Sequence, residues 1–148
     1  MKIKKLIIWV ALAVIAYYGL EIGRVQTSGD VVAYKRFSQA LLHGRMGRAE
    51  LTSNSDLSKQ LSSSQEARVA LHRGVKIVFT YYVVHARRLS ADGRTAYITG
   101  EQVSRVNAPG VSTLWGQREI RVPQTVELEY RQNLWKVTKF SDPAMRSG

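Results

Sequence analysis

The sequence predicts an α+β fold, in which an N-terminal membrane helix is followed by helices packed on one face of a curved, four-stranded antiparallel sheet. Three observations predict this fold. The chain opens with an uncharged apolar run, residues 30–72 place apolar side chains at helical spacing, and residues 75–140 alternate in the manner of strands. Because no helical segment separates the predicted strands, a parallel sheet with helical crossovers is excluded.

We divide the 148-residue chain into four parts. Residues 1–23 form a signal anchor or signal peptide, and residues 24–29 form a short polar linker. Residues 30–142 form the α+β domain, and residues 143–148 form a tail. The part after residue 23 has about 120 residues, which is enough to bury a hydrophobic core of its own.

The opening segment has the charge pattern of an exported protein. Lys2, Lys4 and Lys5 precede an uncharged run that extends to Leu20. Because positive flanks stay on the cytoplasmic side, we expect the rest of the chain to cross the membrane. Residues 6–22 span about 25 Å as a helix, which is at the short end of the workable range for a membrane span. The predicted anchor residues are Leu6, Ile7, Ile8, Trp9, Val10, Leu12, Val14, Ile15, Tyr17 and Tyr18.

Two outcomes of export remain open. A cleavage site can be placed at Ala16, but Tyr17, Tyr18 and Leu20 prolong the apolar run beyond it. We therefore predict an uncleaved, single-pass signal anchor in the inner (cytoplasmic) membrane, with the C-terminal domain outside the cytoplasm. The alternative is a periplasmic or secreted domain, released by cleavage near Ala16.

Composition excludes several kinds of site. The chain has no Cys, which rules out disulfides, thiolate metal sites and a cysteine nucleophile. Its three His residues are scattered, and we expect neither a metal nor a cofactor. The net charge is +11, and +9 remains without residues 1–23. Such a charge is enough to attract anionic lipid, an acidic partner or nucleic acid. Because the charges form no block, a solvated basic surface is the favoured interpretation, and nucleic acid is a scarce partner outside the cytoplasm.

The first helix of the domain is predicted to begin at Asp30, which we expect to cap it, and to stop at His43-Gly44. Its core-facing residues should be Val31, Tyr34, Phe37 (or Ser38) and Leu41. Two further helical stretches follow, over residues 46–51 and from about residue 56 to about residue 72. The second is expected to break within the serine run at residues 62–64.

Four strands are predicted in the second half of the chain. They run over residues 75–89, 94–106, 119–130 and 134–140, with turns at Ser90–Gly93 and Gln132-Asn133. Pro123 cannot donate to a ladder, so it marks an edge position or a bulge on the third strand. Ile120, Val122, Val126, Leu128 and Tyr130 should share one face of that strand.

This order of elements resembles the NTF2-like (cystatin-like, cone-shaped) superfamily from Asp30 to Asp142. The resemblance rests on the helices DVVAYKRFSQALLHG and GRMGRAELTS, the strand GVKIVFTYYVVHARRL, the Asp-Gly hairpin and the last strand NLWKVTKFSD. One membrane helix before such a domain resembles the layout of the bitopic assembly subunit of type IV secretion systems. Those proteins have longer cytoplasmic tails and larger domains.

Enzymes of the superfamily use an acid–base group and a hydrogen-bond donor inside the cone. By that resemblance, the weak catalytic candidates are Tyr81, His85, Tyr97 and Glu101. The plainer interpretation makes His85 the end of a strand emerging into solvent and the tyrosines ordinary sheet residues. Trp115, in the loop between the second and third strands, is either a binding anchor or a lid over the open end of the cone.

Two classes of function follow. The first, which we favour, is a membrane-anchored binding or assembly module without catalysis, docking a protein partner or a second copy. The second is a small-ligand-binding protein or an isomerase- or dehydratase-like enzyme that uses the cone cavity. A cone filled by Phe37, Phe79, Trp115 and Trp135 favours the first class. An open pocket with a His or Tyr beside a carboxylate favours the second.

Overall fold

The computed structural model describes residues 2–51, 53 and 55–146. Residue 1 of the predicted membrane segment and residues 147–148 of the predicted tail lie outside this range. The chain forms five α-helices and four strands in the described part. They are α1 (Lys2–Thr27), α2 (Gly29–Leu42), α3 (Met46–Leu51), α4 (Ser55–Ser63), α5 (Gln65–Ala70), β1 (Lys76–Leu89), β2 (Thr95–Asn107), β3 (Arg118–Arg131), β4 (Leu134–Ser141) and the 3₁₀ turn η1 (Pro143–Arg146).

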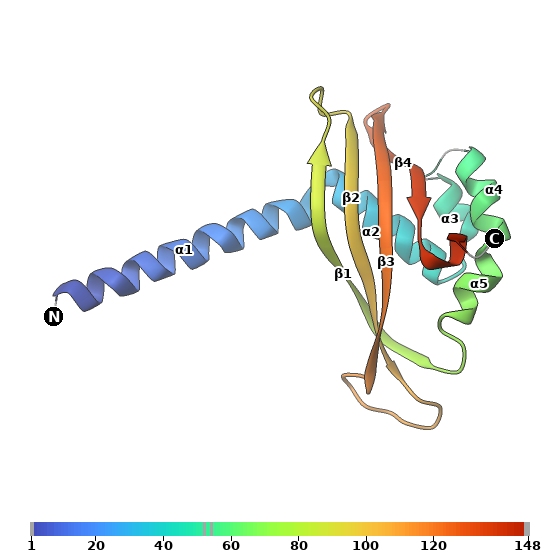
Figure 1. Cartoon of the computed structure of the whole chain (residues 1–148), viewed down its shortest axis with the longest axis horizontal. Coiled ribbons are helices and arrows are strands. Elements are labelled where there is room, and N and C mark those ends of the chain that lie inside the picture. Colours follow the sequence, from blue (N-terminus) through green and yellow to red (C-terminus); the bar gives the residue numbers. More distant parts are fainter. Residues whose placement is uncertain (1, 52, 54, 147–148) are drawn as a thin grey trace.

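The first helix, α1, projects from the domain as a single exposed rod (Figure 1). Within Lys5–Thr27, an 18-residue window has a mean hydropathy of 2.0, and no residue of that window is buried. By length and composition it is able to cross a membrane, and signal sequences pass the same test. Residues 24–27 of the predicted linker continue this helix, so that only Ser28 separates α1 from α2.

The sheet has the order β1-β2-β3-β4 with every neighbour antiparallel. Helix α2 runs behind the sheet, and α3 to α5 lie beyond the β4 side of the same face (Figure 1). One face is therefore covered by helices and the other is not. The predicted α+β fold is confirmed, and the arrangement is consistent with an NTF2-like cone.

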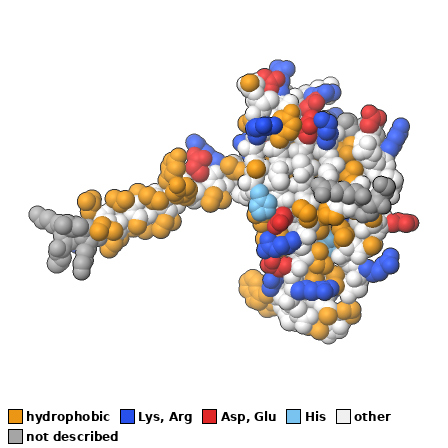
Figure 2. All heavy atoms as spheres, in the orientation of Figure 1, with side chains coloured by type: hydrophobic (Ala, Val, Ile, Leu, Met, Phe, Trp, Pro, Cys, Tyr) orange, Lys and Arg blue, Asp and Glu red, His pale blue; other side chains and the backbone are white. Residues whose placement is uncertain are grey.

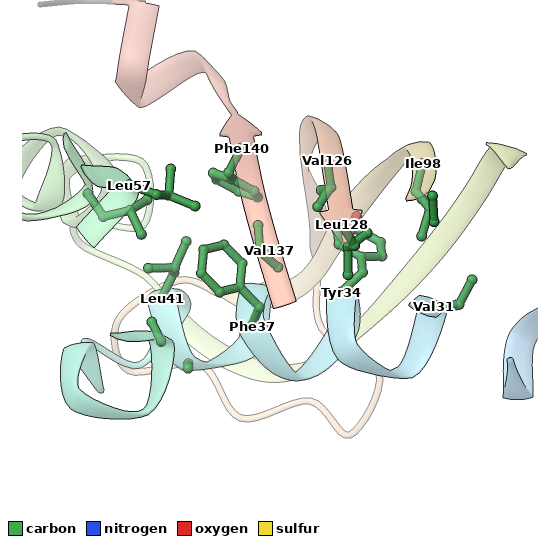
Figure 3. Packing of buried hydrophobic residues seen from close by; sticks show 14 residues of the cluster. Val31, Tyr34, Phe37, Leu41, Leu57, Ile98, Val126, Leu128, Val137 and Phe140 are labelled. Atoms are coloured by element: carbon green, nitrogen blue, oxygen red, sulfur yellow. The ribbon is translucent and has the colours of Figure 1, made fainter. Parts of the chain in front are cut away.

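The core lies between α2 and the covered face of the sheet. Val31, Tyr34, Phe37 and Leu41 point from α2 toward the strands, as their spacing predicts (Figure 3). The ring of Phe37 meets that of Phe140 edge-on, with 5.2 Å between the ring centres. The other members of this cluster include Leu57 and Leu61 of α4, Ile98 of β2, Val126 and Leu128 of β3, and Val137 of β4.

Two local expectations about α2 have different outcomes. The stop at His43-Gly44 is confirmed, because Gly44 takes the left-handed conformation (φ +65°) just after the helix. The expected cap is wrong, because Ser28 takes the cap position and Asp30 lies inside the first turn. The Asp30 carboxylate instead accepts hydrogen bonds from Arg87 of β1, at 2.7 Å and 3.1 Å. A long-range ion pair has replaced a local cap.

Pro123 lies at an edge of the sheet, as predicted. The pairing of β3 with β4 ends at Thr125 and Ser141, so residues 118–124 of β3 pair only with β2. The missing N–H of Pro123 therefore leaves no ladder bond unmade. Beyond Thr125 the sheet narrows to three strands, and the loop between β2 and β3 lies at this end (Figure 1).

Candidate interaction surface

The uncovered side of the sheet, here called the open face, consists of the side chains that point away from α2. Register places on it Tyr81, Val83 and Arg88 of β1, Tyr97, Thr99, Glu101, Val103 and Arg105 of β2, and Glu119, Arg121, Pro123, Thr125 and Glu127 of β3. In the part of the chain that the structure describes, no helix crosses this face.

A continuous row of ion pairs runs along the open face. Glu101 is bonded by Arg121 at 3.1 Å and approached by His85 at 3.6 Å. Arg121 also bonds Glu119 at 2.8 Å, and Glu119 accepts a further bond from Arg105 at 3.1 Å. We call these five residues the ion-pair row. The alternating acidic and basic side chains beside a histidine are visible in Figure 2.

Tyr81 extends this network, since its hydroxyl donates to Glu119 at 3.2 Å. The hydrogen bonds from Arg121, helped by those from Tyr81 and Arg105, hold the pKa of Glu119 below its usual value. The carboxylate therefore stays charged at neutral pH. Exposed ion pairs add little to folding stability, but a connected row holds its charges in fixed positions, ready to meet a complementary surface.

At the end of the sheet where β2 leads to β3, four exposed side chains form an apolar group. We call Phe79, Tyr81, Leu114 and Trp115 the aromatic corner. Trp115 is 74% exposed and Leu114 is 86% exposed. The ring of Phe79 meets that of Trp115 edge-on, with 6.5 Å between the ring centres. Trp115 is thus displayed outward and does not fold over the end of the core.

The loop that displays Trp115 is fastened to the sheet by its own hydrogen bonds. Asn107 and Thr113 bond each other twice, at 2.9 Å and 2.7 Å. Arg105 donates to the carbonyl oxygens of Trp115 and Gly116, at 2.7 Å and 3.1 Å. Gly116 has a φ of +72°, and a Cβ there would lie 2.9 Å from the backbone nitrogen of Val106. The loop therefore requires glycine at that position.

The resemblance places Tyr81, His85, Tyr97 and Glu101 inside the cone, and the structure places all four on the open face. Tyr97 lies under the guanidinium of Arg88, 5.0 Å from its ring centre. The β1 candidates were expected on the wrong face because both faces of β1 carry apolar residues, so alternation alone could not decide which face meets the core. The residues of β1 that pack against the core are Tyr82 and Val84.

Two bulges in β1 also change which face its side chains occupy. The register with β2 shifts between Ile77 and Phe79 and again between Val84 and Ala86. The first shift puts Ile77 and Phe79 on opposite faces although they are two residues apart. The second puts His85 itself at the irregularity. A strict period of two cannot survive such shifts.

Five polar side chains between α2 and the sheet, those of Tyr34, Ser38, Tyr82, Gln102 and Gln124, bond one another. The Gln124 side-chain oxygen accepts from Tyr34 at 2.9 Å and from Ser38 at 2.8 Å. Gln102 donates to the hydroxyl of Tyr82 at 3.3 Å. Burial raises the pKa of Tyr34, so its hydroxyl remains protonated. These groups are neutral hydrogen-bonding partners within the core.

Two of the carboxylates whose side chains the structure describes are buried, and each has an arginine partner. Asp30 is bonded by Arg87, and Asp142 is bonded by Arg68 at 2.8 Å. Burial alone raises the pKa of Asp30, but the hydrogen bonds from Arg87 and Ser28 and the charge of Arg87 lower it below its usual value overall. Neither carboxylate is arranged as a free base. Among the described residues, no cluster of His, Asp and Glu has the makings of a metal site.

A surface cleft of about 640 Å³ lies where β4 ends beside α4. Leu57, Val126 and Phe140 form part of its wall, and Tyr97 and the ion pair of Glu127 with Lys139 form another part. Its volume is in the range of small-molecule sites.

Comparison with known proteins gives similarity of structure at low sequence identity. No family model matches the chain, and no curated protein matches it. A ketosteroid isomerase-like protein from Shewanella frigidimarina aligns with a TM-score of 0.49 and 16% identity, over 77% of this chain and 94% of that one. The intermembrane space region of the chloroplast protein ARC6 aligns with a TM-score of 0.45 and 15% identity, over 74% and 90%. At these values neither similarity bears on activity.

Proposed function

We propose that this chain is a membrane-tethered binding or assembly module, held outside the cytoplasm by α1. Its open face would dock a protein partner or a second copy of the chain. The observation that carries the proposal is the uncovered sheet face, with its ion-pair row beside an apolar helix that the domain does not bury.

Membrane tethering is supported by the junction between α1 and the domain. Val25, in the last turn of α1, packs against the core cluster, and Lys35 of α2 donates to the backbone oxygen of Gln26 at 3.3 Å. A segment destined for removal near Ala16 would leave the second half of this helix behind, including Tyr17, Tyr18 and Leu20, which are all exposed. Retention in the bilayer covers those side chains.

A docking role fits the chemistry of the open face better than catalysis does. The interior is filled by Phe37 and its neighbours, and Trp135 packs against the same cluster. His85 does lie beside a carboxylate, that of Glu101, but both are on the surface and in line with Arg121. Phe79 and Trp115, which were also expected to fill the cone, lie on the side of the open face instead. The resemblance to the bitopic assembly subunit of type IV secretion systems, which concerns layout alone, is the source of assembly as one form of the proposed docking.

Photo-crosslinking in intact membranes tests the docking face. A photoreactive residue in place of the exposed Thr99 should give a defined adduct, either with a second copy or with another protein. The matched control replaces Lys59, which is exposed on α4 on the other side of the domain. Adding Glu101→Arg should remove the Thr99 adduct, because it opposes Arg121 with a like charge. Equal adducts at both positions, or a Thr99 adduct unaffected by Glu101→Arg, would count against the proposal.

The cleft beside α4 favours a second candidate, the binding of a small molecule. Its wall combines apolar side chains with one ion pair, a combination suited to an amphipathic ligand. A thermal-shift screen on the full-length chain tests it, with Thr125→Trp as the control, since an indole there narrows the cleft. Ligands that raise Tm in both proteins equally do not bind in the cleft.

A further inference from the structure

We propose that the aromatic corner lies in the headgroup layer of the same bilayer that α1 enters and so forms a second membrane contact. The occupant of this apolar surface is then lipid. The inference rests on the proposed function in one respect, the retention of α1 as an anchor.

The domain lies a short distance from the bilayer that α1 enters. The uncharged run ends at Leu20, and Val25 already packs against the core of the domain. Five helical residues cover about 8 Å. The headgroup region on each side of a bilayer is about 5–8 Å thick. The side of the domain that faces along α1 therefore lies within or beside the headgroup layer.

Hydrogen bonds at its last turn set the direction of α1. Its last turn is bonded to α2 through Lys35, which donates to the backbone and side-chain oxygens of Gln26. Ser28, at the junction, donates to the carbonyl oxygen of Val25 at 2.7 Å. These bonds hold the helix at a set angle to the sheet. In Figure 2, hydrophobic side chains gather at the lower left of the domain, on the side toward which α1 extends.

The aromatic corner has the side chains that membrane interfaces favour. Tryptophan and tyrosine are the residues enriched at membrane interfaces, where a ring meets the headgroups and a polar atom meets water. Leu114 and Trp115 are the most exposed of the large apolar residues outside α1. The backbone of their loop is bonded by Arg105 and Asn107, so entering the interface strips few polar groups of water.

Basic side chains flank the aromatic corner. Lys76 and Arg118 are exposed at the same end of the sheet, where register places them opposite Asn107 and Val106, the last residues before the loop; Arg118 lies on the other face of the sheet from Phe79. Basic residues beside an apolar interfacial group strengthen its attraction to anionic lipid. The corner joins one end of the ion-pair row, through Tyr81 and Arg105. The other end of the row, at Glu101 and His85, stays on the open face away from this contact.

Tryptophan fluorescence of the full-length protein in proteoliposomes tests the inference. The chain has three Trp, and the double variant Trp9→Phe/Trp135→Phe leaves Trp115 alone. In bilayers of phosphatidylcholine and phosphatidylglycerol, replacing part of the lipid by its acyl-brominated form should reduce Trp115 emission about two-fold. The matched control adds Trp115→Phe and Leu134→Trp to the double variant, which moves the lone indole to the other end of the sheet. Its emission should not change when the brominated lipid is added.

Single-cysteine labelling gives an independent measurement with all three Trp in place, because the natural chain has no Cys. Ser112→Cys, in the loop, should react several-fold more slowly with a polar maleimide in liposomes than Ala91→Cys in the β1–β2 hairpin. Equal rates, together with unquenched Trp115 emission in a protein that sediments with the liposomes, overturn the inference and leave the anchor intact. If Trp115 emission instead shifts with the protein-to-lipid ratio and brominated lipid does not quench it, the corner contacts a second copy of the chain. That result also overturns the inference. Release of the protein from the liposomes contradicts the proposed function itself.

Discussion

Replacing Arg87 by Ala removes the partner of a buried carboxylate and should destabilise the domain strongly. Arg87 holds Asp30 through two hydrogen bonds, and the Asp30 side chain is 1% exposed. Removing one member of a buried ion pair costs about 3–5 kcal/mol, because the other charge remains without compensation. The guanidinium is partly exposed, so we expect a loss of about 3 kcal/mol in the free energy of unfolding. That is a large share of the stability of a domain of this size.

The loss should depend on pH with a defined sign. In the natural protein the pKa of Asp30 is depressed, so the pair contributes stability above the unfolded pKa of about 3.9 and loses it as pH falls through the folded value. In Arg87→Ala, burial without the arginine raises the pKa of Asp30, so the variant is penalised as pH rises. The difference between the two proteins should therefore be largest near about pH 7 and shrink below about pH 4.

Urea unfolding of the full-length protein in a nonionic detergent, followed by tryptophan emission, measures this difference. The control is the double variant Arg87→Ala/Asp30→Asn, in which no charge remains to be neutralised. Its difference from the natural protein should be smaller near neutral pH and should vary less with pH than that of Arg87→Ala. A loss below about 1 kcal/mol in Arg87→Ala, or a loss that is the same at both pH values, would refute the reasoning.

Three further substitutions test the packing. Phe37→Ala should cost about 3–5 kcal/mol in unfolding free energy, since its ring is fully buried against Phe140; a loss under about 1 kcal/mol would show that the core is not packed as described. Gly100→Ala should cost about 1–3 kcal/mol, because its Cβ would lie 2.4 Å from the carbonyl oxygen of Val83, and an unchanged denaturation midpoint would contradict that contact. Trp115→Ser should alter stability by less than about 0.5 kcal/mol, because the indole is exposed; a large loss would mean that it is part of the fold.

The sequence predicts most of the fold because its local signals agree with the tertiary contacts. The α2 stripe of Val31, Tyr34, Phe37 and Leu41 is a regular helical period, and all four residues are buried. The short helix Met46–Leu51 was predictable from residue spacing. The break after Ser63 was predictable from the run of serines at residues 62–64. The Asp-Gly hairpin and the alternation of β3 are equally local.

What could not be predicted depends on contacts distant in sequence. Asp30 has the position of a helix cap, but its partner, Arg87, is 57 residues away. The faces of β1 could not be assigned because apolar residues occupy both and two bulges shift the register. One part of the ion-pair row is local in sequence, because Glu119 and Arg121 are two residues apart and so lie on one face of β3. Their partners Glu101 and Arg105 come from β2, and only the register brings them together.

The measurement that tests the central claim most directly is the intact mass of the native protein in separated membrane and soluble fractions. A membrane-tethered module predicts the full 16.7 kDa chain in the membrane fraction, resistant to washing with alkaline carbonate. A shorter chain that begins at Tyr17 and is recovered in the soluble fraction would contradict the account, because α1 would then be a discarded signal.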